Sequence, residues 1–300
     1  MAAAMACSAP LAFAVNPVTG PAAQVALCIG PHNQGVFNPL TAYPDPIRYG
    51  PASERLKLTI KGNFYSLDVT AAAEEAMAEW MAAIPGLRFQ RVPVYEMTPE
   101  TLRLQVDFNN RIGALGAGFK AGSPTTDGVP VLAFFVQSFL DMAADDVFDS
   151  NRPFLAATTM DDYLAFLLKM TAKHELGHVL GFMHTPVQMA GDHVTADTAA
   201  CPGTAYFTPT DIAAGPPIMA PNLQVALRLM RDYHGRPVTL ADIQIAPQEA
   251  AVGRGAFAQD CPRTRQELAA RGAGTGRSLN CLTPTSIVYP SLPAVRQLLD

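Results

Sequence analysis

Charged residues are scarce in this chain of 300 residues, in which Asp, Glu, Lys and Arg together make up 16%. The 21 basic and 26 acidic side chains give a net charge of −5, and no basic run is dense enough to bind nucleic acid. Long apolar runs are also missing, since a typical one, residues 129–140, is too short to cross a bilayer. A content of 49% hydrophobic residues nevertheless excludes intrinsic disorder. We expect a globular protein that neither binds nucleic acid nor spans a membrane.

Cysteines are few, and none stands in a C-x-x-C pair, so a cysteine zinc site or dithiol redox motif has no support. Residues 1–14 are almost wholly apolar and end in Ala12-Phe13-Ala14, the small-x-small pattern of signal peptidase sites. This segment resembles the tail of a signal peptide and predicts export, to the periplasm or the extracellular space; the alternative is a flexible apolar leader. Cleavage after Ala14 would leave an even number of cysteines for disulfides, the alternative being buried free thiols: Cys28, Cys201, Cys261 and Cys281.

The pattern along the chain predicts an extended N-terminal arm over residues 15–55, which are rich in Pro, Gly and Asn without periodicity. Residues 56–60 alternate as a strand does, and residues 71–83 are rich in helix formers. Thr70 can cap that helix, and Pro85-Gly86 ends it. Three further strands are expected, at residues 87–94, 101–108 and, after a glycine-rich connection, 129–136. The order strand, helix, strand, strand, strand predicts an α+β domain whose sheet has one helix laid across it.

An acidic stretch follows at residues 141–157, with Asp141, Asp145, Asp146, Asp149 and Asn151. Clustered carboxylates can bind calcium, but the spacing differs from an EF-hand loop and lacks its Gly and terminal Glu. A solvated acidic turn is the favoured interpretation, with calcium as the alternative.

A long helix is predicted from Thr159 to about Leu180. Thr159 and Asp162 form the S/T-x-x-acid pattern of a helix start. At 100° per residue one stripe collects Tyr163, Leu167, Met170, Thr171, His174 and His178, while the opposite side collects Asp162, Ala165, Lys169 and Lys173. A single histidine on the buried stripe would most often be a core residue. Two at positions i and i+4 can reach one metal ion together.

Three further residues complete a candidate catalytic site. Glu175 lies about 100° around the helix from His174, where it cannot easily be a ligand but can reach a water held by the metal. Gly181 can adopt positive φ, end the helix and turn the chain back. His184 can then be a third ligand, and three protein ligands leave one position open for water, as in catalytic zinc sites.

Residues 174–184 match the metzincin signature H-E-x-x-H-x-x-G-x-x-H at every fixed position, and the chain therefore resembles the metzincin zinc peptidases. The resemblance implies one catalytic Zn²⁺ held by His174, His178 and His184, with Glu175 as general base. The family also has a methionine turn beneath the metal, for which residues 216–221, with Met219, are the match. Without the histidine motif, Met219 would be interpreted as an ordinary core methionine. The implied fold is α+β: a twisted mixed sheet with an antiparallel edge strand, two long helices and a small irregular C-terminal subdomain.

Within the metzincins the chain is most similar to the matrixin group, through Met219-Ala220-Pro221 and the capping-box pattern of residues 239–243. The resemblance covers residues 56–252, which leaves residues 253–300 as a C-terminal extension. Departures are the Thr185-Pro186 pair after the third histidine, the absence of a tyrosine two positions after Met219, and a long insertion at residues 185–218. Histidines of the matrixin structural zinc site are missing near residues 107–118, and the surroundings of Cys28 do not match the propeptide cysteine switch.

The insertion contains Asp192, His193, Asp197 and Cys201. His193 could bind a second metal, although a polar surface loop is the favoured interpretation.

We therefore expect an exported zinc endopeptidase in which Glu175 takes a proton from a metal-activated water and delivers it to the leaving amine. A protein or peptide substrate would extend along an edge strand within residues 129–136. Two alternatives are a zinc-binding interaction module without turnover, and a toxin-like effector that cleaves one protein target. The sequence indicates no oligomeric state.

Overall fold

The computed structural model describes residues 43–60, 64–108, 114–185, 215–247, 249–250 and 253–254, and the backbone of four short strands outside them. Those strands are β1 (Leu27–Ile29), β9 (Val187–Ala190), β10 (His193–Ala196) and β11 (Ala205–Phe207). β1 pairs with β11 and β9 pairs with β10, both antiparallel. Most of the sequence-predicted arm, the cysteines after Cys28, and Asp192 and Asp197 lie outside the described residues, as does the side chain of His193.

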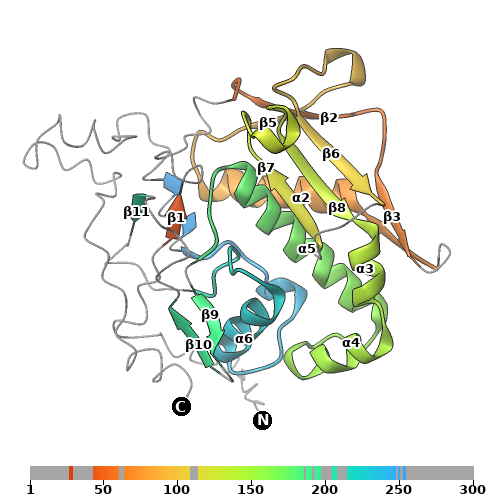
Figure 1. Ribbon diagram of the computed structural model, residues 1–300, viewed down its shortest axis with the longest axis vertical. Coiled ribbons are helices and arrows are strands. Elements are labelled where there is room, and N and C mark those ends of the chain that lie inside the picture. Colours follow the sequence, from red (N-terminus) through yellow and green to blue (C-terminus); the bar gives the residue numbers. More distant parts are fainter. Residues whose placement is uncertain are drawn as a thin grey trace, which may run out of the picture.

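The centre of the molecule is a five-stranded sheet in the order β5-β2-β6-β8-β7. The strands are β2 (Ile47–Gly50), β5 (Phe89–Arg91), β6 (Leu102–Asp107), β7 (Gly116–Phe119) and β8 (Val131–Phe135). The first four in this order run parallel, and β7 pairs antiparallel with β8. Figure 1 shows helices α2 (Val69–Ala83) and α5 (Met160–Val179) lying together across the sheet. The mixed sheet of the sequence prediction, with its antiparallel strand, is therefore present.

The edge strand differs from the sequence prediction. Residues 129–136 contain β8, an interior strand between β6 and β7, and all five residues of β8 are buried. Its unbroken apolar run is typical of a strand covered on both faces, not of an edge. β7 forms the edge instead, from the glycine-rich sequence Gly-Ala-Gly-Phe that sequence analysis took for a connection.

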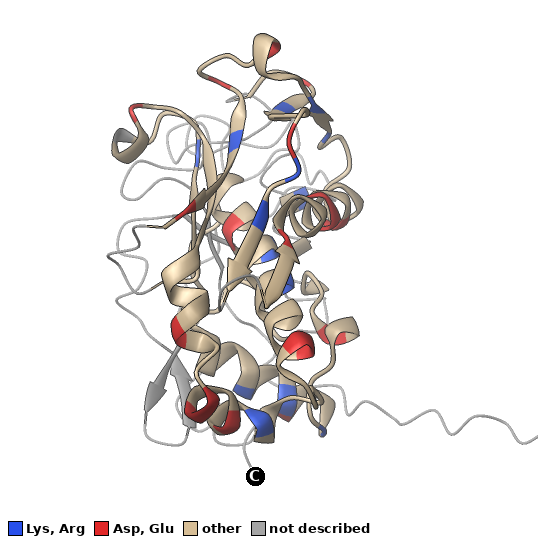
Figure 2. Ribbon diagram, turned by 90° about the vertical axis from the view of Figure 1, so that its right-hand side faces the viewer, with Lys and Arg blue, Asp and Glu red and all other residues tan. Residues whose placement is uncertain are grey.

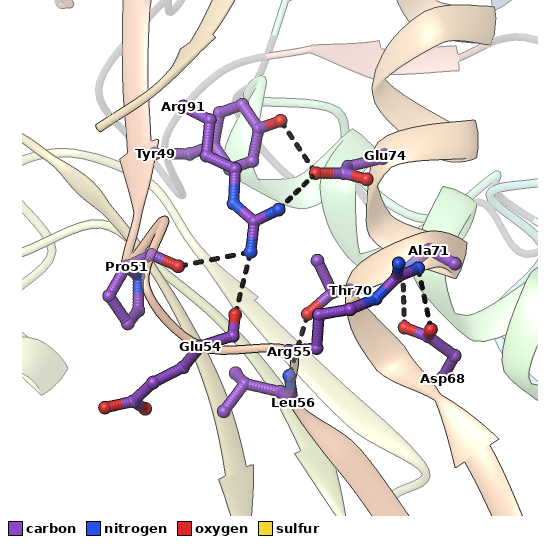
Figure 3. Close-up of polar contacts among 10 residues, drawn as sticks. All are labelled: Tyr49, Pro51, Glu54, Arg55, Leu56, Asp68, Thr70, Ala71, Glu74 and Arg91. Atoms are coloured by element: carbon purple, nitrogen blue, oxygen red, sulfur yellow. Dashed lines mark hydrogen bonds and ion pairs between the residues drawn. The ribbon is translucent and has the colours of Figure 1, made fainter. Parts of the chain in front are cut away.

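The predicted arm contributes to the sheet as well. Ile47–Gly50 forms β2, which lies between β5 and β6. Figure 3 shows how the segment after it is held: the Arg91 guanidinium donates to the carbonyl of Glu54 at 2.7 Å and pairs with Glu74 of α2 at 3.1 Å. The Tyr49 hydroxyl donates to the same Glu74 carboxylate at 3.2 Å. These contacts fasten the connection after β2 to the first half of α2.

Helix α2 follows the hairpin of β3 (Lys57–Ile60) and β4 (Tyr65–Asp68). Its N-cap is Asp68, whose Oδ1 accepts from the Ala71 amide at 2.8 Å, so the predicted cap at Thr70 is wrong. Thr70 instead accepts from the Leu56 amide at 2.9 Å and ties the hairpin to the helix. Met77 and Trp80 of α2 are both buried, and the helix ends before Pro85-Gly86 as expected.

The acidic stretch is helical and not a turn. It contains the end of α3 (Val136–Met142), then α4 (Asp145–Asn151) and a 3-10 turn at Arg152–Phe154. Asp145 and Asp146 occupy the first turn of α4, where the helix dipole favours negative charge. The aspartates are exposed, as expected for solvated groups.

Helix α5 follows the prediction closely. Thr159 is its N-cap and accepts from the Asp162 amide at 3.2 Å. Of the predicted stripe, Tyr163, Leu167, Met170 and Thr171 are buried, and His174 and His178 are half-buried. Lys173, expected on the exposed side, is fully buried. Its ammonium contacts the carboxylate of Glu79 in α2 and donates to the carbonyl of Ile243. α5 is thus covered on two sides, by the sheet and by α2 with the C-terminal segment.

Beyond residue 185 and the strands β9, β10 and β11, the described chain resumes at residue 215 and forms α6 (Leu223–His234), capped by Asn222. The predicted capping box is present, with Thr239 and Asp242 bonded reciprocally, but it opens a 3-10 turn, Leu240–Asp242. Basic and acidic residues are interspersed over the ribbon without a large field of one sign (Figure 2). Among the described helices, none has the length and apolar content to cross a membrane.

Candidate metal centre

The last turns of α5 carry the first two predicted metal ligands. His174 and His178 are one turn apart, and their ring centroids are 4.8 Å from each other. Gly181 then takes φ +93°, which closes the helix with bonds from the Gly181 amide to the His178 carbonyl and from the Phe182 amide to the Gly177 carbonyl, each 2.9 Å. This reversal brings the His184 ring to 4.7 Å from the His178 ring.

The three imidazoles point their Nε2 atoms at one another. The Nε2 atoms of His174 and His178 are 3.1 Å apart, and those of His184 and His174 are 3.2 Å apart. The third separation, between His178 and His184, is 3.1 Å. A point about 2.0–2.1 Å from all three nitrogens therefore exists, which is the usual Zn–N distance. Among the described residues this triad is the group with metal-ligand spacing.

Hydrogen bonds on the far side of two rings indicate which nitrogen is free to bind. His174 Nδ1 lies 2.8 Å from the Ile218 carbonyl, and His178 Nδ1 lies 2.8 Å from the Phe182 carbonyl. A carbonyl only accepts, so both Nδ1 atoms carry the proton and both Nε2 atoms present a lone pair. Lone pairs this close repel unless a cation lies among them, and neutral imidazoles suit zinc. The residues present thus fit a zinc ion.

Electrostatics favour the same neutral state. Burial lowers the pKa of His174 to about 4, helped by the nearby His184 and opposed by the bond to Ile218. Burial likewise lowers the pKa of His178 to about 3, with His174 adding to the effect. Both rings are therefore neutral at neutral pH, with one proton on Nδ1 and none on Nε2, as metal ligands must be.

Glu175 lies beside the triad against the edge strand. Burial raises the pKa of its carboxyl group, while His178 and a hydrogen bond from the Gly118 backbone act in the opposite direction. The strand approaches α5 so closely here that a β-carbon on Gly118 would lie 1.9 Å from the Glu175 carbonyl oxygen. The glycines of β7 are what allow this contact, and their role was missed by sequence reasoning.

The predicted methionine turn lies under the triad. Met219 is fully buried, and its carbonyl accepts from the amide of Thr185, next to His184, at 2.7 Å. The preceding residue, Ile218, accepts from His174, as described above. A residue that sequence reasoning missed, Glu249, accepts from the Met219 amide at 2.8 Å. No motif marks it, because one glutamate in an alanine-rich segment carries no local signal.

Three histidines around one point, with a carboxylate beside them, form a candidate metal site with the donor set of a zinc metallopeptidase. The model of the matrixin family matches residues 55–194. This part of the chain is therefore a matrixin-type domain of the metzincin class, which confirms the resemblance seen in the sequence. The family is one of zinc metallopeptidases, and its members are commonly extracellular.

A solved structure described as the GM1 bound form of the ECX AB5 holotoxin contains a chain with a similar fold. The TM-score is 0.58 with 21% identity, over 78% of this chain and 88% of that chain. At this identity the likeness shows the fold alone. No curated protein matches the chain.

Proposed function

We propose that this protein is an exported zinc endopeptidase. The observation that carries the proposal is the set of three Nε2 atoms 3.1–3.2 Å apart, with the Glu175 carboxyl group beside them. His174, His178 and His184 would hold the ion, leaving one coordination position for water. When bound, zinc lowers the pKa of that water and polarises the carbonyl of the scissile bond.

Glu175 moves the proton. Its carboxylate accepts a proton from the attacking water and then donates it to the nitrogen of the leaving amine. The raised pKa supports this role, because a carboxyl group that holds a proton more readily can both take it up and deliver it. The hydrogen bond from the Gly118 backbone orients the carboxylate toward the strand edge.

The substrate would bind along β7. This strand pairs with β8 on one side and has its other edge unpaired in the described sheet, so an extended peptide can add there through backbone hydrogen bonds. β7 replaces residues 129–136 as the proposed substrate strand. Its contact with Glu175 supports the placement, because a peptide on this edge would lie next to the proposed base.

The experiment compares wild type with Glu175→Ala on casein and gelatin, with the zinc content of each protein measured. We expect Glu175→Ala to bind one zinc per chain and to lose activity about 10²–10⁴-fold. The matched control is Glu96→Ala, which removes an exposed glutamate that is distant from Glu175 in the sequence. This variant should leave activity unchanged. Chelation should abolish wild-type activity, and added zinc should restore it.

Two results would contradict the proposal, and a third would restrict its substrate. Equal activity of Glu175→Ala and wild type would remove Glu175 as the base. Bound zinc without turnover on any peptide library would favour an interaction module. Cleavage of a single protein, with casein and gelatin untouched, would favour the toxin-like effector, which shares the chemistry but not the general substrate.

A further inference from the structure

Glu249 is a fully buried carboxylate that the proposed mechanism does not use. Its Oε1 accepts from the Met219 amide at 2.8 Å, and its Oε2 accepts from the Ala246 amide at 2.9 Å. The backbone of Ile218 also donates to it. Among the described residues it forms no ion pair, so backbone amides alone stabilise this carboxylate. Burying an acidic group without a counter-ion costs several kcal/mol, whereas an apolar side chain of similar size would pack here at no such cost.

The peptide unit that joins Ile218 to Met219 donates its N–H to Glu249 and presents its carbonyl to the metal centre. The Ile218 carbonyl accepts from Nδ1 of His174 at 2.8 Å. The Met219 carbonyl accepts from the Thr185 amide at 2.7 Å, directly after His184. In both residues the amide donates to Glu249, whereas the Ile218 carbonyl accepts from a proposed zinc ligand and the Met219 carbonyl accepts from the residue that follows one. The turn therefore connects one carboxylate to two of the three histidines.

We propose that Glu249 is a positioning residue of the metal centre, which fixes the backbone of Ile218 and Met219 so that their carbonyls set the tautomer of His174 and the placement of His184. The inference rests on the proposed zinc site. In its ionised form Glu249 is an acceptor-only group, which suits the task because it can take several amide donors at once and has no donor of its own to clash with them. The bond to the Met219 amide also polarises the peptide unit that carries the Ile218 carbonyl, which makes this carbonyl a better acceptor for His174.

A purely structural role is the alternative, in which Glu249 only ties the C-terminal segment to the turn. The two roles differ in what happens at the metal. A structural tie affects the stability of the fold and leaves the affinity of the folded protein for zinc unchanged. A positioning residue changes the metal affinity and the coordination geometry, since groups that orient metal ligands typically contribute 10–100-fold to affinity.

The test uses the full chain with Glu249→Gln. Glutamine retains one acceptor oxygen but presents an NH₂ group to at least one of the three amides that Glu249 binds, so at least one hydrogen bond is replaced by a donor–donor contact. We expect zinc affinity, measured by competition with a chromophoric chelator, to fall about 10–100-fold. With cobalt in place of zinc, the visible absorption bands should shift.

Leu58→Ala is the control for lost stability. Leu58 is fully buried in β3, which packs on α2 and α3, and its truncation should destabilise the fold without changing zinc affinity or the cobalt spectrum. Unchanged affinity and an unchanged spectrum in Glu249→Gln would overturn the inference and leave the proposed peptidase intact. Failure of the wild type to bind zinc would instead overturn the proposed function.

A measurement on the wild type covers the case in which Glu249→Gln does not fold. In the metal-free protein, the amides of Ile218 and Met219 should exchange slowly with solvent deuterium, because Glu249 orders the turn before zinc binds. Rapid exchange that becomes slow only when zinc is added would mean that the metal orders the turn, and this would overturn the inference.

Discussion

Gly177 and Met219 lie so close that no side chain fits between them: a β-carbon on Gly177 would lie 2.3 Å from the Sδ atom of Met219. Gly177 is the residue before His178, in a helical position where glycine costs about 0.8–1.0 kcal/mol relative to alanine. The metzincin motif leaves this position free, so the motif does not explain the glycine. The contact explains it, because the buried methionine occupies the space that a β-carbon would need.

Gly177→Ala is therefore expected to destabilise the protein in spite of the better helix propensity of alanine. Overpacking of a core costs about 1–3 kcal/mol, which exceeds the gain in propensity. Denaturant unfolding should show a net loss of about 1–2 kcal/mol. In the Met219→Ala background, where the space is open, the same change should be neutral or stabilising. Equal losses in both backgrounds would contradict the contact.

Gly118→Ala should be more damaging. Its β-carbon would lie 1.9 Å from a backbone oxygen of Glu175, which cannot rotate away as a side chain can, so β7 and α5 must separate. We expect a loss of stability of about 3 kcal/mol and at least tenfold lower peptidase activity. The matched control is Gly215→Ala, whose β-carbon would lie 3.1 Å from a side-chain atom of Pro247. Similar losses in the two variants would refute the argument from close approach.

The buried Lys173 predicts an asymmetry between two substitutions. Lys173→Met removes the charge and leaves Glu79, whose side chain is 32% exposed and can be hydrated. Glu79→Gln leaves an ammonium group in the core without its counter-charge, although burial already lowers the pKa of Lys173. We expect Glu79→Gln to cost more unfolding free energy than Lys173→Met, as measured with urea at pH 7. The reverse order would mean that the bond to the Ile243 carbonyl matters more than the ion pair.

Glu249 predicts a pH dependence of stability. Burial raises its pKa to about 7, opposed by bonds from the backbone of Met219, Ala246 and Ile218. The folded protein thus holds this proton more tightly than the unfolded chain, and the resulting stability is fully present below the ordinary pKa of glutamate. It is lost as pH rises to about 7, by as much as about 3 kcal/mol.

Unfolding of wild type and Glu249→Gln between pH 4.5 and 8 measures this effect. The difference in unfolding free energy, wild type minus variant, should decrease up to about pH 7 and then stay level. Titration of all other groups is common to the two proteins and cancels. A difference that stays constant across this range would show that the carboxyl group is ionised throughout.

Sequence periodicity is sufficient to predict the arrangement of residues that lie within a few positions of one another along the chain. The cap at Thr159, the stripe along α5 and the spacing of His174, Glu175, His178 and Gly181 all lie within one helix and its exit turn, so 3.6-residue geometry alone predicts how they are arranged. β8 and β6 were likewise predicted from their apolar residues.

Strands without such a pattern were missed or misplaced. β7 is rich in glycine because α5 crosses it at close range, and β2 is short and followed directly by Pro51. Neither strand shows the alternation of apolar and polar residues by which a half-buried strand is recognised. The residues of each strand are determined instead by contacts with segments that are distant along the chain. Assigning the edge of the sheet to residues 129–136 followed from missing β7.

The sequence by itself determined the chemistry of the site: which three imidazoles and which carboxylate belong together, through covalent spacing along a helix and one glycine turn. The tertiary structure decided what surrounds them. Only folding brings β7 against Glu175, buries Lys173 between Glu79 and Ile243, and places Glu249 under the turn of Met219. These contacts join residues 30 to 94 positions apart, and they depend on which surfaces exclude water, which no local pattern encodes.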